Sequence, residues 1–177
     1  MRKPEQRYQG RETLAGGFFI VGATLISLEA LKPQLKRGGR LLGLDLGTKT
    51  IGLALSDVEY RIATPLRTIK RVKFREDAAS LVKTAAEFGI VALVLGLPLN
   101  MDGSEGPRAQ ATRAFVRTLA PILPLPVVFW DERLSTVAAE RALLEADMSR
   151  AKRGAVIDST ASAYILQGAL DRLARLA

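Results

Sequence analysis

The segment that most constrains the fold is LLGLDLGTKTIGLALSD, residues 41–57, because it places one aspartate inside an apolar strand. Residues 41–46 and 51–57 are short apolar runs, and a glycine-led turn separates them. This pattern predicts two antiparallel strands joined by a hairpin. Asp45 lies between two leucines of the first strand, where an unpaired charge would be costly. Its position therefore indicates a functional role.

The rest of the chain predicts alternating helices and strands. We expect strands over 61–71, 90–97 and 125–132, helices over 74–89, 108–120 and 135–148, a basic linker over 149–154, and a long final helix over 155–176. The run 90–97 is apolar throughout, which is typical of a buried central strand. With such short links, the first three strands should form an antiparallel meander. The order predicts one α/β domain over residues 40–177.

Residues 1–39 differ from the rest and are predicted to be an N-terminal extension. The first 40 residues hold eight of the 26 Lys and Arg residues against three Glu, and residues 13–28 are uncharged. A basic start before a short apolar run also resembles a signal peptide. We favour an extension that is partly disordered or packed on the domain. The net charge of +8 favours a polyanionic partner, although much of it lies in this extension.

The chain contains no cysteine and no histidine. Disulfides, thiolate nucleophiles, Cys/His zinc sites and histidine general bases are therefore excluded. Any metal chemistry has to use oxygen ligands, which favour hard cations such as Mg²⁺ or Mn²⁺.

Acids at three places could provide those ligands. Asp45 lies in the first strand, Asp131 and Glu132 end the strand 125–132, and Asp158 falls in the first turn of the final helix. Carboxylates gathered at one rim of a sheet repel one another unless cations neutralise them. The alternative is that Asp131 is a cap or a surface charge and that Asp158 only favours the helix dipole.

Two glycine-rich segments are candidate phosphate contacts. The turn after Asp45 carries Lys49 between two threonines, and the loop within 96–110 leads to Arg108 at a helix start. Backbone amides and these cations suit a phosphate. The alternatives are a tight hairpin and an ordinary surface loop, and the spacing fits neither a Walker A loop nor a dinucleotide fingerprint.

Four segments together resemble the YqgF/RuvX family, Holliday junction resolvase-like proteins regarded as nucleases that mature the precursor of 16S rRNA. They are GLDLGTKTIGLALSD (43–57), GLPLNMDGSEGPRA (96–109), DERLST (131–136) and KRGAVIDSTASAYIL (152–166). The resemblance covers about residues 38–173. It implies an RNase H-like fold, with a mixed five-stranded sheet of three antiparallel strands followed by parallel ones, flanked by helices.

The resemblance also implies site residues. Its acidic triad maps onto Asp45, Glu132 and Asp158, which would bind Mg²⁺ or Mn²⁺, and Arg133 would contact a phosphate or a carboxylate. One departure concerns Thr50, where the family often has arginine, so a phosphate contact at that position is not expected. Lys152 and Arg153, just before the predicted final helix, are candidates to hold the substrate backbone.

The function expected is a cytoplasmic, metal-dependent endonuclease that processes the 5′ end of pre-16S rRNA. Its partners would be structured RNA or branched DNA and a ribosomal precursor particle, with no membrane, and it would act as a monomer or a homodimer. A Holliday junction resolvase and a non-catalytic ribosome-assembly factor are the alternatives. An actin-like ATPase also opens on a D-x-G-T strand, but it needs two such domains, and 177 residues provide one.

Overall fold

The computed structural model describes residues 18–19, 24–134 and 150–176 of the chain, and for residues 18–19, 24 and 150–158 it describes the backbone alone. The predicted helix over 135–148 and most of the region before residue 24 lie outside the described residues.

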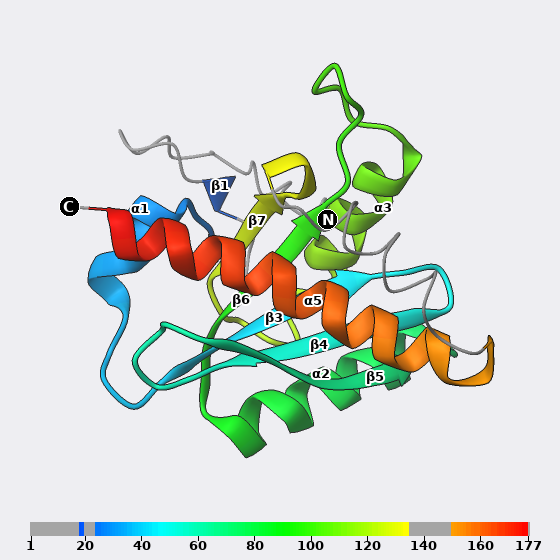
Figure 1. The fold of residues 1–177 in the computed structure, drawn as a ribbon, viewed down its shortest axis with the longest axis horizontal. Helices are drawn as coiled ribbons and strands as arrows, with labels where there is room; N and C mark the ends of the chain where they lie inside the picture. The colour runs from blue at the N-terminus through cyan, green and yellow to red at the C-terminus, as the bar shows by residue number, and fades with distance from the viewer. Residues whose placement is uncertain (1–17, 20–23, 135–149, 177) are drawn as a thin grey trace, which may run out of the picture.

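Five strands form a mixed sheet in the order β5-β4-β3-β6-β7 (Figure 1). They are β3 (Arg40–Leu46), β4 (Thr50–Ser56), β5 (Ala63–Lys70), β6 (Ile90–Leu97) and β7 (Val127–Asp131). The pairs β3–β4 and β4–β5 are antiparallel, whereas β3–β6 and β6–β7 are parallel. The predicted mixed five-stranded sheet is thus confirmed. Two short strands, β1 (Phe18–Phe19) and β2 (Thr24–Leu25), continue it beyond β7.

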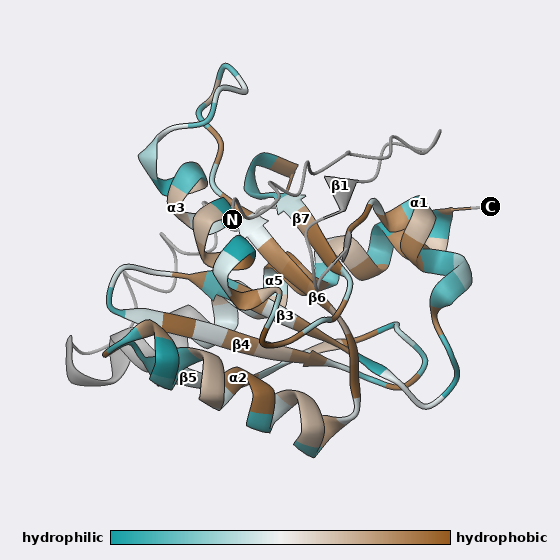
Figure 2. Ribbon diagram, turned by 180° about the vertical axis from the view of Figure 1, so that it is seen from behind, coloured by the Kyte–Doolittle hydropathy of each residue, from teal (hydrophilic) through white to brown (hydrophobic). Residues whose placement is uncertain are grey.

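Helices cover both faces of this sheet, which explains why its central strands are apolar throughout. On one face lie α2 (Phe74–Phe88) and α3 (Pro107–Leu119), seen in front of the sheet in Figure 2. The long helix α5 (Arg150–Arg175) crosses the other face. Within β3, Leu42 and Leu44 pack towards α2 and α3, and Leu41 packs towards α5.

The ends of α2 and α3 follow from local chemistry. The helix α2 stops at Gly89, whose φ of +63° lies in the left-handed region that favours glycine. The helix α3 begins at Pro107, where the missing N–H group costs nothing.

The predicted basic linker over residues 149–154 is wrong from Arg150 onwards, because α5 already begins there. Alanine, lysine and arginine are good helix formers, and the cost of Gly154 in a helix is only about 1 kcal/mol. Lys152 and Arg153 therefore lie within α5. Asp158 is the ninth residue of this helix. The prediction that it falls in the first turn is therefore wrong.

The described part of the predicted N-terminal extension packs on the domain. Leu25 pairs with Val127 in β7, and α1 (Leu28–Leu31) then leads into η1 (Lys32–Gln34), a short 3-10 helix. Leu28 and Leu31 are buried in the same core as α5. Within the residues that the structure describes, no helix is both long and apolar enough to cross a membrane.

Candidate active site

Asp45 lies near the end of β3 and is only 4% exposed. Side chains two residues apart in a strand share a face, and Gly43 shows which face that is. A Cβ atom on Gly43 would lie 2.7 Å from the Cβ of Leu166 in α5. The side chain of Asp45 therefore faces α5, at the edge of the sheet where β3 ends.

Glu132 follows β7, which is separated from β3 by β6, and its side chain lies on the same face of the sheet as that of Asp45. It opens η2 (Glu132–Leu134), a 3-10 turn directly after β7, so it does not end the strand as predicted. A Cβ atom on Gly96 would lie 2.5 Å from Glu132 Oε1 and 2.6 Å from Ile165 Cδ1 of α5. The carboxylate thus lies over Gly96, between the sheet and α5.

The strand register brings these two acids together. Leu44 pairs with Leu95 in the parallel β3–β6 ladder, so the next residues along, Asp45 and Gly96, lie side by side. Neighbouring strands are about 4.8 Å apart. Asp45 and the carboxylate above Gly96 therefore share one small region of the sheet edge.

The direction of α5 brings the backbone of Asp158 towards this region. The side chain of Gln167 bonds to the backbone of Arg61 and Ala63, at the sheet edge where β3 begins. The carbonyl oxygen of Ser162, five residues earlier, lies next to Gly43. Asp158 comes about one helical turn before Ser162, so the backbone at Asp158 lies further towards the end of β3.

The donor chemistry of this region fits a hard divalent cation. Asp45 and Glu132 provide carboxylate oxygens, and the whole chain has no histidine or cysteine that could compete. Within the described ranges, no three Asp, Glu, His or Cys side chains form a metal-binding group. Because the side chain of Asp158 lies outside those ranges, the triad stays a prediction.

Asp131 and Arg133 form a clamp beside Glu132. Arg133 donates from Nε to both carboxylate oxygens of Asp131, at 3.0 and 3.1 Å, and from Nη2 to Oδ2 at 2.7 Å. These hydrogen bonds hold the pKa of the Asp131 carboxyl below its ordinary value. Arg133 therefore contacts a carboxylate, one of the two partners expected for it, and Asp131 is already engaged beside the proposed ligand Glu132.

The same arginine holds the loop that follows β6. Its Nη1 donates to the carbonyl of Met101 at 3.3 Å. The loop is closed by a hydrogen bond of 2.9 Å from Asn100 N to Ser104 O, and Asp102 accepts from the N–H and the hydroxyl of Ser104. The glycine-rich loop within 96–110, a candidate phosphate contact, is thus an ordered turn linked to the end of β7.

Replacing Arg133 by glutamine should loosen this loop. We expect faster amide hydrogen exchange at residues 101–104 and a rise in the pKa of Asp131 towards its ordinary value. Since folding lowers that pKa, the clamp stabilises the protein above about pH 4 and is lost as the pH falls through the folded-state value. The variant should therefore show a weaker acid dependence of its unfolding free energy. Arg113→Gln, which removes a hydrogen-bond partner of Glu105, is the control and should leave exchange at 101–104 unchanged.

A second arginine braces the turn after Asp45, and sequence reasoning had not singled it out. Arg71 donates from Nη1 to Gly47 O at 2.7 Å and from its backbone N–H to Lys49 O at 2.8 Å. Its Nε lies 3.4 Å from Oδ2 of Asp77, whose side chain is 3% exposed, and its guanidinium stacks 5.7 Å above the ring of Phe115. Nothing in the local sequence pattern pairs position 71 with position 77.

An Arg71→Met substitution should lower the free energy of unfolding by about 3 kcal/mol, because the buried carboxylate of Asp77 loses its counter-charge. Urea denaturation measures this loss. Arg67→Met provides the matched control, since Arg67 pairs with Glu87 at 3.1 Å where both side chains are more than 40% exposed. The control should cost less than about 1 kcal/mol. Equal losses of unfolding free energy in the two variants would show that the ion pair of Arg71 with the buried Asp77 does not stabilise the protein more than an exposed pair does.

Of the four predicted cations other than Arg133, the structure describes the side chains of two. Lys49 is exposed in the turn between β3 and β4, close to the strand end that carries Asp45, and Arg108 is exposed in the first turn of α3. Lys152 and Arg153 are described by their backbone alone, in the first turns of α5. Their roles in substrate binding stay predictions.

Comparison with known proteins identifies the family. Residues 39–172 match the model of the family described as RuvX, Holliday junction resolvase. The chain belongs to the RuvX family. The match begins just before β3 and ends within α5, so it contains the whole five-stranded sheet and every proposed site residue.

Several curated proteins are close to this chain in sequence. A protein of Cereibacter sphaeroides strain ATCC 17025 is 66% identical over 83% of this chain and 92% of its own length. One from Methylocella silvestris is 58% identical over 88% of this chain and 97% of its own length. Both relatives are named as proposed nucleases of pre-16S rRNA. RuvX membership and these relatives confirm the expected nuclease.

A solved structure confirms the fold. The RuvC structure from Thermus thermophilus superimposes with a TM-score of 0.50 at 16% identity, covering 76% of this chain and 96% of that one. The RNase H-like architecture predicted from the sequence motifs is thus present in this RuvX protein.

Proposed function

We propose that this protein is a divalent-metal-dependent endonuclease that processes the 5′ end of pre-16S rRNA. The observation that carries the proposal is the buried Asp45 beside Gly96, with the Glu132 carboxylate lying over that glycine. A protein interior tolerates such neighbouring carboxylates when a cation or a proton neutralises them.

Mg²⁺ or Mn²⁺ would be held by Asp45, Glu132 and Asp158. Asp45 would take the central position, because it lies between the strand end next to Glu132 and the path of α5. A divalent cation bound there would activate water and stabilise the charge that develops on the phosphate. The acids would keep this region negatively charged, while the packing of α5 against β3 and β6 would limit access of bulk water. The substrate backbone would be held by four cations, Lys49, Arg108, Lys152 and Arg153.

The names of the relatives support an rRNA precursor as substrate, and the printed description of the family supports a four-way DNA junction as the second candidate. The protein would then act on structured RNA in the cytoplasm, on or near a ribosomal precursor particle. A resolvase would need a symmetric dimer with two active sites, whereas cleavage of one RNA strand needs only a monomer.

A cleavage assay with two substrates tests this proposal. Purified protein is incubated with a 16S precursor fragment and with a four-way DNA junction, in Mg²⁺, in Mn²⁺ and in EDTA. We expect cuts in the precursor with either metal and none in EDTA. Faster cutting of the junction would favour the resolvase, cleavage that persists in EDTA would exclude metal catalysis, and binding without cleavage would favour an assembly factor.

A further inference from the structure

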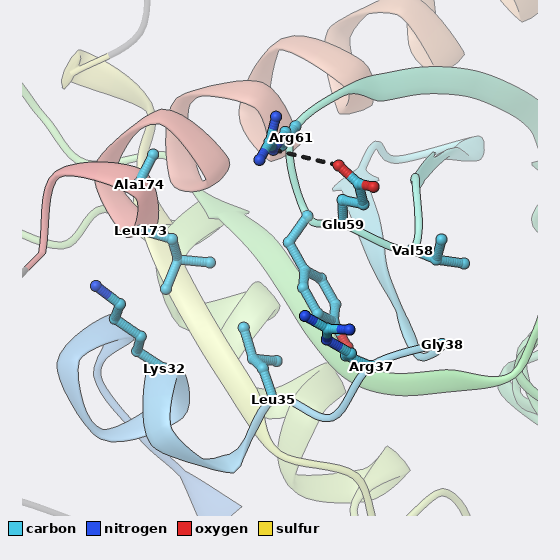
Figure 3. A pocket seen from close by; sticks show the side chains of 10 residues that line it. Lys32, Leu35, Arg37, Gly38, Val58, Glu59, Arg61, Leu173 and Ala174 are labelled. Atoms are coloured by element: carbon cyan, nitrogen blue, oxygen red, sulfur yellow. Dashed lines mark ion pairs between the residues drawn. The ribbon is translucent and has the colours of Figure 1, made fainter.

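The end of the molecule away from Asp45 carries an open hollow of about 810 Å³ (Figure 3). Its walls come from three segments that are far apart in the chain: residues 32–38, the loop 58–61 between β4 and β5, and residues 173–174 of α5. From Asp158 to Leu173, α5 rises by roughly 22 Å, at about 1.5 Å per residue. The hollow therefore lies roughly 20 Å from the proposed active site, at the other end of α5.

Positive charge predominates in this hollow. Lys32, Arg37 and Arg61 line it, against a single acid, Glu59. Arg61 and Glu59 pair at 3.4 Å, but their side chains are 76% and 65% exposed, so solvent and salt weaken the pair. Arg61 can thus exchange Glu59 for another anion at little cost. Arg37 is exposed and has no ion-pair partner within the described part of the chain.

The loop that carries Arg61 is held in place before any ligand arrives. Tyr60 has a φ of +59°, in the left-handed region that non-glycine residues rarely adopt. Its hydroxyl donates to the carbonyl of Lys36 at 2.6 Å, which joins the loop to the N-terminal wall. The carboxylate of Asp57 accepts from the backbone N–H of Arg61 at 2.6 Å. Strained backbone that the surroundings hold in this way is concentrated at binding sites.

We propose that this hollow is a second binding site for the phosphodiester backbone of the nucleic acid that the active site cuts. The inference rests on the proposed function, since it assigns the hollow to the same substrate. Arginines suit phosphate oxygens, and the apolar side chains of Leu35, Val58 and Leu173 in the wall suit a sugar or a base. About six base steps of a B-form DNA duplex, at about 3.4 Å each, or a slightly larger number of steps in the more compact A-form RNA helix, span the roughly 20 Å between the two sites. A nucleic acid is favoured over an acidic peptide because one continuous chain of phosphates can occupy both.

RNA binding in EDTA, where no cleavage is expected, tests the inference by fluorescence anisotropy. The probes are labelled RNA hairpins of about 16 and about 4 base pairs, the second too short to span the two sites. The test variant is Arg37→Gln with Arg61→Gln. The matched control is Arg75→Gln with Lys83→Gln, which removes the same charge from exposed positions of α2, on the other face of the sheet.

The test variant should bind the long hairpin about tenfold more weakly than the control, and its slope of log affinity against log salt should fall by about 2. Both variants should bind the short hairpin alike. Glu59→Gln should tighten binding of the long hairpin, a gain that a purely structural role would not produce. The inference is overturned if the test and control variants bind the long hairpin equally.

These outcomes are separate from those of the cleavage assay. A wild-type protein that cuts nothing, yet shows the expected binding differences, would refute the proposed function and support the second site. In a cleaving enzyme, the test variant should raise KM for the long substrate and leave kcat unchanged, because Arg37 and Arg61 are remote from the proposed reacting atoms.

Discussion

An Asp45→Asn variant should lose cleavage by at least about a thousandfold, which corresponds to about 4 kcal/mol of transition-state stabilisation. Asparagine has nearly the same shape as aspartate but lacks the negative charge that a divalent cation needs. Because Asp45 is 4% exposed beside another carboxylate, the variant should also fold at least as stably as the wild type. Single-turnover cleavage of a 16S precursor fragment and urea denaturation measure the two effects.

The control for this variant is Asp171→Asn, the same chemical change on the exposed side of α5, where the carboxylate accepts a hydrogen bond from Gln167. It should retain wild-type cleavage. If Asp45→Asn kept more than about a tenth of the activity, Asp45 could not be the central metal ligand, and the proposed site would have to be abandoned.

A Gly96→Ala variant should have the second-largest effect, since one methyl group would displace an acid of the proposed site. The added Cβ would lie 2.5 Å from Glu132 Oε1 and 2.6 Å from Ile165 Cδ1, so both neighbours have to move. We expect a loss of about 1–3 kcal/mol in unfolding free energy. Cleavage should fall about a hundredfold, because a displacement of about 1 Å near the reacting atoms has effects of that size.

Gly168→Ala separates overpacking from damage to the site. Its Cβ would lie 2.8 Å from the Trp130 ring, at the same interface between α5 and the sheet, and its nearest neighbours are atoms of that ring and not of a proposed ligand. Gly168→Ala should lower the free energy of unfolding by about as much as Gly96→Ala does. It should leave the Mg²⁺ concentration for half-maximal cleavage unchanged. That concentration should rise in Gly96→Ala. If both variants shifted it equally, Glu132 would not be part of the metal site.

The sheet could be predicted from the sequence because each strand follows a local pattern. The apolar run over 90–97 indicated a strand with both faces covered, and the structure has it as β6 between β3 and β7. The charge of Asp45 inside such a run was equally visible. The edge of the sheet on which the acids converge followed from the order of the elements.

The sequence did not predict contacts between charges that no single helix or strand period connects, or charges whose partners are ambiguous. Arg71 follows the end of β5 and Asp77 lies in the first turn of α2, so no periodicity connects them. Asp131 and Glu132 are adjacent, and local sequence could not separate the residue that pairs with Arg133 from the one that faces α5. The basic run over 149–154 resembles a linker, yet α5 begins at Arg150, because alanine, lysine and arginine are good helix formers and one glycine does not end the helix.

The position of α5 has a consequence for the order in which the chain can mature on the ribosome. This helix is made after every strand of the sheet, and it covers the apolar residues Leu41, Ala54, Ala92 and Val94. Until it emerges, the nascent sheet exposes that face to other chains and to chaperones. Because Asp158 arrives on the same helix, we expect an incomplete chain to be unable to damage RNA near its own site of synthesis.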